Sequence, residues 1–236
     1  MQGLIGPLKE LAEFEELCKN KKKDVGMIRV CGCVNSQKSH MMYALGDGCK
    51  YKVIACSSET KAKQIYEEYR FLDSNTYLYP AKDFLFYQAD IRSKELVKQR
   101  MEGIQAVLSG EPVTVVTSLD GFMDHLAPKE SIAEKVLKIQ NDSILKLDEM
   151  AEKLSVIGYD REVQVEGPGQ FAVRGGILDI YPLTEELPVR IELWGDEVDS
   201  IRTFDVESQR SIENLEELVI YPATEVPADS KRIEEG

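Results

Sequence analysis

Basic and metal-binding side chains are scarce in this sequence, and each shortage excludes a class of function. The 236 residues include 29 lysines and arginines against 42 aspartates and glutamates, which gives a net charge of −13. Nucleic-acid binders usually carry a basic excess because they neutralise phosphates, so we expect poor DNA binding here. The acidity suits a basic protein partner or serves solubility alone. His40 and His125 are the two histidines, and they lack the spacing of a metal site.

Cysteine pairs and long apolar runs are also missing. The five cysteines are an odd number without a C-x-x-C pair, which favours reduced thiols in a cytosolic protein: Cys18, Cys31, Cys33, Cys49 and Cys56. No apolar run approaches the ~20 residues of a membrane helix, and residues 1–6 show no signal-peptide pattern. We therefore expect a cytoplasmic protein without a membrane segment.

Short β-branched segments and longer amphipathic segments alternate in the first half. Strands are predicted over residues 27–31, 51–56, 75–79 and 113–117. Helices are predicted over residues 8–18, 37–45, 58–72 and 95–108, with Ser57 or Ser58 as a cap and Gly110 as a stop. Alternation of this kind is typical of a doubly wound α/β lobe with a parallel sheet.

The second half is organised around Gly167–Pro182. Period-2 alternation predicts strands on both sides of the turn Gly167-Pro168-Gly169, and Gly175-Gly176 predicts a bulge or sharp bend within the second strand. Two further strands, over 189–194 and 197–204, complete a predicted four-stranded antiparallel meander. Outside the meander we predict a strand over 135–139, a helix capped by Asp142 or Ser143, and a strand over 218–221.

A phosphate-loop pattern with one missing glycine lies at residues 32–39, G-C-V-N-S-Q-K-S. Gly32, Lys38 and Ser39 match G-x-x-x-x-G-K-[ST], whereas Gln37 replaces the second glycine. Glutamine adds a side chain where the backbone must wrap phosphates. The strand over 113–117 also ends without the acidic residue that would hold magnesium, since Asp120 falls in the next helix. We predict a degenerate loop and no cofactor, with an active phosphate-loop NTPase as the alternative.

Two long runs in the second half carry a specific resemblance to a known family. They are F-A-V-R-G-G-I-L-D-I-Y-P at 171–182 and R-I-E-L-W-G-D-E-V-D-S-I-R-T-F-D at 190–205. Both resemble the UvrB family of nucleotide excision repair, and are most similar to the UvrB-like N-terminal module of bacterial transcription-repair coupling factors (Mfd). The run F-D-V-E-S-Q-R-S at 204–211 favours the coupling factors over UvrB. The similarity extends back through Tyr79-Pro80 and residues 117–126.

This resemblance implies a fold and a function. The fold is α/β: a degenerate P-loop-NTPase-like lobe with a parallel sheet (1–126 and 211–236), and an inserted smaller α+β lobe with an antiparallel sheet (127–210). The implied function is non-catalytic recruitment: the coupling-factor module of this family recruits UvrA by mimicking UvrB. The full-length family member is an ATP-dependent DNA translocase, so we expect this chain to be a fragment. In the longer protein, another domain is expected to mask the docking surface.

The site residues are carried over by position. Arg174 and Arg161 match the arginines with which the family contacts UvrA, and Phe171 is an adjacent aromatic candidate. UvrB has a further arginine where this chain has Ala172. An arginine can bind a partner carboxylate with two parallel hydrogen bonds. The alternative for Arg174 is an ion pair within the chain, to Glu162, Asp179 or Glu192.

The interval in which UvrB has its DNA-clamping hairpin is short in this chain. It runs from Pro80 to Asp90 and contains Phe84, Phe86 and Tyr87, for which packing is a better interpretation than base stacking. DNA binding is therefore not expected, although a UvrB-like damaged-DNA module remains a second alternative. Trp194, the single tryptophan, is expected in the core or at a sheet edge.

Overall fold

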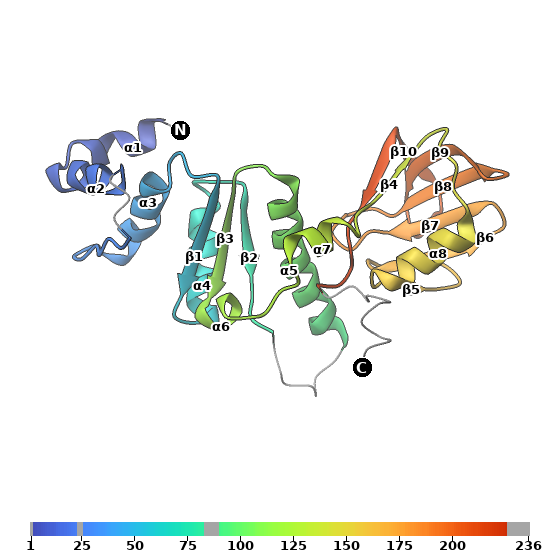
Figure 1. Ribbon diagram of the computed structural model, residues 1–236, viewed down its shortest axis with the longest axis horizontal. Coiled ribbons are helices and arrows are strands. Elements are labelled where there is room, and N and C mark those ends of the chain that lie inside the picture. Colours follow the sequence, from blue (N-terminus) through green and yellow to red (C-terminus); the bar gives the residue numbers. More distant parts are fainter. Residues whose placement is uncertain (1, 23–25, 83–89, 226–236) are drawn as a thin grey trace. The chain divides into compact units, whose positions relative to one another are not determined.

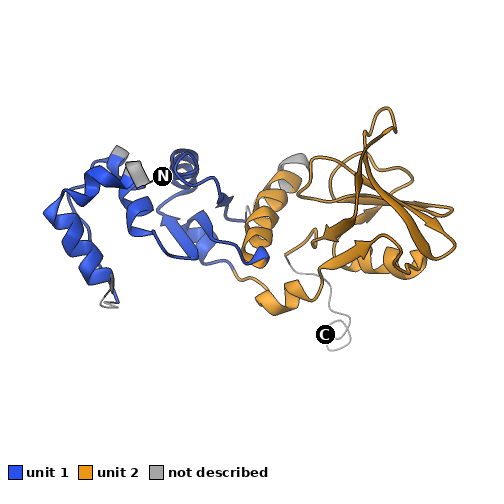
Figure 2. Ribbon diagram, turned by 90° about the horizontal axis from the view of Figure 1, so that it is seen from above, with its two compact units in different colours: residues 1–82, 109–124 blue, residues 83–108, 125–236 orange. Residues whose placement is uncertain are grey.

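The computed structural model describes residues 2–22, 26–82 and 90–225 (Figure 1). The chain forms two compact units (Figure 2): the first contains residues 1–82 and 109–124, and the second contains residues 83–108 and 125–236. A parallel sheet in the first unit and an antiparallel sheet in the second confirm the predicted α/β class. In the part of the chain that the structure describes, no helix is long and apolar enough to cross a membrane.

The first unit is built on a three-stranded parallel sheet of order β1-β3-β2, with β3 in the centre as predicted. Its strands are β1 (Tyr51–Cys56), β2 (Thr76–Tyr79) and β3 (Val113–Ser118). Its helices are α1 (Gln2–Lys9), α2 (Ala12–Lys22), α3 (Asn35–Leu45), α4 (Glu59–Tyr69) and α6 (Leu119–Phe122). The strand–helix alternation read from the sequence is therefore confirmed from α3 through β3.

Helix α4 packs on this sheet and supplies much of the core. Ala62 and Ile65 of α4 meet Cys56 and Val116 of the strands, and the Ser58 hydroxyl accepts a hydrogen bond from the Lys61 amide (3.3 Å), as the predicted cap requires. Burial raises the pKa of the Cys56 thiol, which is typical of an inert structural cysteine.

Two predictions for the N-terminal part are wrong. Residues 27–31 form no strand, and the predicted helix over 8–18 is divided between α1 and α2. The side chain of Met27 is 85% exposed and those of Ile28 and Val30 are also exposed. An alternating pattern fits a pleated strand only where a partner strand and an apolar face are present to receive it.

The second unit contains a six-stranded sheet of order β10-β9-β8-β7-β6-β5, antiparallel except for β5 beside β6. Its strands are β5 (Asp160–Arg161), β6 (Gln170–Arg174), β7 (Ile177–Tyr181), β8 (Val189–Trp194), β9 (Glu197–Phe204) and β10 (Ser211–Leu215). A separate pair joins β4 (Leu137–Gln140) to β11 (Glu217–Ile220). The helices are α5 (Asp90–Ser109), α7 (Lys129–Ala133) and α8 (Leu147–Val156).

The two faces of the six-stranded sheet differ in polarity because side chains alternate along each strand. One face carries core residues that are at most 1% exposed: Phe171, Leu178, Ile180, Ile191 and Ile201. Helix α8, whose apolar side packs beside β5 and β6, contributes the buried Met150, Ala151 and Leu154. The other face carries charged residues at the matching positions of three neighbouring strands, Asp179, Arg190 and Arg202.

Turn geometry in this unit corrects three sequence predictions. Gly175-Gly176 is a two-residue hairpin turn that separates β6 from β7, where a bulge or sharp bend within one continuous strand was predicted. Gly175 has φ 58°, and a positive φ at the first central residue is what a type II′ hairpin turn requires. The predicted strand through Val163 and Val165 is replaced by a loop after β5, and α8 begins at Leu147 with Lys146, not Asp142 or Ser143, at its N-cap.

The predicted return of residues 211–236 to the first lobe stays a prediction. In the described part of this range, β10 pairs with β9 and β11 pairs with β4, so both strands are hydrogen-bonded inside the second unit.

Candidate functional site

A cluster of two arginines around one buried aspartate lies on the polar face of the six-stranded sheet. The Asp179 side chain is 2% exposed, and its Oδ1 accepts a hydrogen bond from Arg190 Nε (2.7 Å). Its Oδ2 accepts from Arg190 Nη2 (2.8 Å) and from Arg174 Nη2 (3.0 Å). We call Arg174, Asp179 and Arg190 the arginine–aspartate cluster. Two positive charges share one carboxylate, so the cluster is locally cationic within an acidic chain.

Strand register brings these side chains together. Asp179 of β7 lies opposite Arg190 of β8, so the two side chains are direct cross-strand neighbours. The guanidinium of Arg190 also stacks over the Phe204 ring, with 4.5 Å to the ring centroid, and donates to Gln209 Oε1 (2.8 Å). The hydrogen bonds from Arg190 to Asp179 raise the pKa of this guanidinium. Arg190 is therefore held in place from several sides.

Arg174 differs from Arg190 in its exposure. Its side chain is 48% exposed against 15% for Arg190. Among the described residues, Asp179 is its hydrogen-bond partner, and this contact uses one of the five N–H groups of the guanidinium. The ion pair to Asp179, one of the three alternatives in the sequence, is thus present. It orients Arg174 and leaves donors directed to solvent.

The other two predicted contact residues lie in neighbouring strands, at paired positions. Arg161 of β5 is exposed and stands opposite Phe171 of β6. The Phe171 side chain is 0% exposed and belongs to the core, so it does not present an aromatic surface to a partner. The alternation of apolar and polar residues predicted the strand correctly. It did not indicate that both Phe171 and its neighbour Ala172 are buried. Trp194, expected in the core or at an edge, is 85% exposed at the end of β8.

Residues 32–39, the predicted degenerate phosphate loop, lead into α3, and the described residues directly before them, 26–31, form no strand. Gly32 has φ 85°, and the helix begins at Asn35. Lys38 Nζ donates to Asn35 Oδ1 (2.9 Å), while Ser39, 4% exposed, donates to Glu68 Oε2 of α4 (2.9 Å). In an active loop these two side chains would contact phosphate and Mg²⁺. Here both bind groups of the protein, and Gln37 is exposed.

A residue that the sequence reasoning missed occupies the carboxyl edge of the parallel sheet. Glu59, the first residue of α4, accepts hydrogen bonds from the Ala81 amide (3.0 Å) and from the Ser118 hydroxyl. Open α/β sheets bind ligands at this edge, where a carboxylate repels phosphate. The sequence signal that could have identified Glu59 is its position at the start of a predicted helix that follows a predicted strand. Asp120 lies in α6, as predicted, and not at the strand end.

We expect this chain to show no saturable binding of ATP. The reason is that Ser39 is engaged by Glu68 and that Glu59 places negative charge at the sheet edge. Titration with a fluorescent ATP analogue and Mg²⁺ checks this, with Lys38→Ala as the matched variant. Saturable binding by the wild type that Lys38→Ala abolishes would contradict the prediction and support the NTPase alternative.

Two further predictions concern DNA and metal. The aromatic residues Phe84, Phe86 and Tyr87 lie outside the described residues, so their interpretation as packing residues stays a prediction. Within residues 2–22, 26–82 and 90–225, no group of three or more histidine, cysteine, aspartate or glutamate side chains is placed to hold a metal ion.

Comparison with known proteins identifies the region that carries the arginine–aspartate cluster. Residues 137–226 match the family model of the UvrB interaction domain. This region is similar to that family over its whole matched length. The match covers α8 and every strand from β4 to β11, and the resemblance inferred from the runs at 171–182 and 190–205 is confirmed.

Curated relatives extend the similarity beyond this region. The chain is 33% identical over 222 residues to the transcription-repair-coupling factor of Bacillus subtilis (strain 168), which covers 93% of this chain and 19% of that protein. It is 38% identical over 153 residues to the coupling factor of Staphylococcus epidermidis (strain RP62A), covering 65% of this chain and 13% of the relative. The Staphylococcus aureus (strain Mu50) coupling factor is 36% identical over 157 residues, covering 66% and 13%. The chain thus spans less than a fifth of the length of these relatives.

Proposed function

We propose that this chain is a non-catalytic recruitment module that binds UvrA and links stalled transcription to nucleotide excision repair. The observation that carries the proposal is Arg174, an exposed arginine that a buried aspartate orients on the polar face of the six-stranded sheet, within the region similar to the UvrB interaction domain. Arg161, exposed at the edge strand β5, is the second proposed contact. Phe171 is omitted because its side chain is buried.

The physical argument rests on how interfaces distribute binding energy. A few arginine and aromatic anchors carry most of it, and an anchor that is already oriented loses less conformational entropy on binding. Arg174 meets both conditions, because Asp179 fixes it and Arg190 holds Asp179. Its unused N–H groups suit a carboxylate of the partner in a bidentate pair.

The remaining parts of the proposal concern the first unit and the cellular setting. We propose that the first unit is a degenerate P-loop-NTPase-like lobe that neither hydrolyses ATP nor needs a cofactor. The engagement of Ser39 by Glu68 supports this, and the net charge of −13 supports weak DNA binding. We further propose that the chain acts in the cytoplasm as part of a longer translocase, in which another domain masks the docking surface.

Arg174→Ala is expected to weaken binding to purified UvrA by about an order of magnitude, a loss of roughly 1.4 kcal/mol. The variant should keep its stability within about 1 kcal/mol, because the lost ion pair is half exposed on the arginine side. Isothermal titration of wild type and variant against UvrA measures the effect. Arg70→Ala, which removes an exposed arginine of α4's C-terminal end in the first unit, is the matched control and should bind like wild type.

Equal affinity of wild type and Arg174→Ala would contradict docking through β6. Absence of any binding by a folded wild type would overturn recruitment as a whole. Salt-sensitive binding to damaged duplex DNA instead would favour the UvrB-like alternative.

A further inference from the structure

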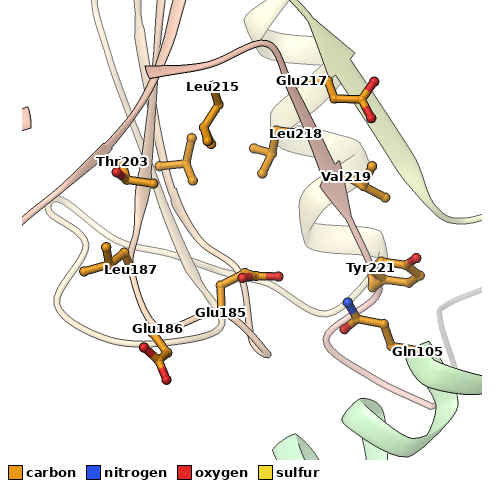
Figure 3. Close-up of a pocket in the computed structure, with 11 residues that line it drawn as sticks. Gln105, Glu185, Glu186, Leu187, Thr203, Leu215, Glu217, Leu218, Val219 and Tyr221 are labelled. Atoms are coloured by element: carbon orange, nitrogen blue, oxygen red, sulfur yellow. The ribbon is translucent and has the colours of Figure 1, made fainter. Parts of the chain in front are cut away.

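A pocket of about 470 Å³ opens in the second unit, away from the arginine–aspartate cluster (Figure 3). Its volume lies within the range of sites that bind small ligands. The walls come from the loop between β7 and β8, from β8 to β11, and from α5. The apolar part of the lining consists of Leu187, Val189, Leu215, Leu218, Val219 and Tyr221.

Every charged residue in the lining is a glutamate: Glu185, Glu186 and Glu217. Glu217 is already engaged, since its carboxylate binds Lys138 Nζ (2.7 Å) and Gln140 Nε2 (3.0 Å). Figure 3 shows the Glu185 side chain reaching between Leu187 and Tyr221, whereas Glu186 points outward. Within the described residues, the Glu185 carboxylate has no hydrogen bond and no ion pair. An unpaired anion therefore stands beside an apolar wall.

This pocket and the arginine–aspartate cluster lie on opposite faces of the sheet. Val189 and Thr203, which line the pocket, are paired in β8 and β9 one position before Arg190 and one position after Arg202. Successive side chains of a strand point to opposite faces, so the polar face that carries Arg190 faces away from the pocket. A ligand in the pocket and a partner on the arginine–aspartate cluster can be bound at the same time.

We propose that this pocket binds a partner peptide through one lysine or arginine side chain flanked by an aliphatic residue. The ammonium or guanidinium group pairs with Glu185, and the methylene stem lies along Leu187, Val219 and Tyr221. Long basic side chains combine an apolar stem with a charged end, which matches an apolar wall that ends in a carboxylate. The net charge of −13 adds long-range attraction for a basic segment.

A protein segment is favoured over nucleic acid by the signs of the charges. Phosphates would meet three glutamates and no basic side chain in the lining. The proposal does not depend on UvrA recruitment, because it concerns other residues on the other face of the sheet.

The test is a titration of the whole chain with two capped probe peptides, Ac-GLKVG-NH₂ and Ac-GLEVG-NH₂, followed by amide chemical shifts. The lysine peptide is expected to shift Glu185, Leu187, Val219 and Tyr221 in a saturable manner, and the glutamate peptide is not. Glu185→Gln should weaken binding about three- to fivefold, the upper range for an exposed ion pair. Glu186→Gln removes a neighbouring charge that points outward, and it should change affinity less than twofold.

A second variant, Val219→Lys, tests the proposal independently of Glu185→Gln. Val219→Lys places a cation inside the pocket and should abolish the shifts while the amide spectrum remains that of the folded chain. Equal binding of both peptides, or shifts confined to the face of Arg174, would overturn the proposal. Saturation of the same residues by free lysine amide as readily as by the peptide would assign the pocket to small cations, and would overturn it too.

Discussion

Asp179→Ala is expected to destabilise the second unit by about 3 kcal/mol. Asp179 is 2% exposed and compensates Arg190, whose side chain is 15% exposed. Removing the carboxylate leaves a largely buried guanidinium without its counter-charge, which costs more than the ion pair contributes. The expected loss is at the low end for buried pairs because Arg190 keeps Gln209 and the Phe204 ring.

Urea unfolding followed by circular dichroism measures this effect, and Arg174→Ala provides the comparison. That variant removes the exposed partner of the same aspartate and should lose no more than about 1 kcal/mol. Equal stability of Asp179→Ala and Arg174→Ala would contradict the prediction that Asp179 compensates the largely buried charge of Arg190. The double variant Asp179→Leu/Arg190→Met should recover most of the stability, because it removes both charges.

Replacing either partner of the buried pair Arg100–Glu225 is expected to cost about 3–5 kcal/mol. Arg100 of α5 is 0% exposed, and Glu225 follows β11 with a side chain that is 8% exposed. Arg100 Nη2 donates to Glu225 Oε2 (3.0 Å), and Arg100 Nε donates to Oε1 of the same carboxylate. The pair joins residues that are 125 positions apart, so its loss removes a contact between α5 and the chain that follows β11.

A double-mutant cycle tests this with Arg100→Met, Glu225→Leu and the two combined. Each single variant removes the contact that the opposite buried charge makes across this pair, whereas the combination removes both charges together. We expect the combination to be more stable than either single variant, and hydrogen exchange of the α5 amides to report the change locally. Strictly additive losses would show that the two side chains are not coupled.

Local sequence signals predicted those helices and strands that depend mainly on neighbouring residues in the chain. The apolar β-branched run at 113–117 gave a central buried strand, and Ser58 capped α4 as expected. Asp179 was one of the three predicted ion-pair partners of Arg174. The set was small because a residue in a β-sheet has few neighbours on the adjacent strands. The family resemblance rested on contiguous residues, and for this reason it was readable without a structure.

Predictions failed where a second segment decides the outcome. Residues 27–31 have a strand pattern, but they pair with no strand in the part of the chain that the structure describes. Phe171 was expected as a contact residue because it lies near the arginine matched by the family resemblance, yet the residues packed on β6 bury it completely. Gly175-Gly176 is compatible with a bulge or with a hairpin, and the pairing of Arg174 with Ile177 selects the hairpin.

By itself, the sequence determined the α/β class, most strand and helix positions, the similarity of residues 137–226 to the UvrB interaction domain, and the acidity that disfavours nucleic acid. Tertiary structure alone decided that Arg174 is exposed while Phe171 is not, and that Ser39 binds Glu68. It also decided that Glu185 meets an apolar wall built from distant strands. The physical reason is that propensity and periodicity act over a few neighbouring residues, whereas burial and charge pairing depend on which distant segments fold against each other.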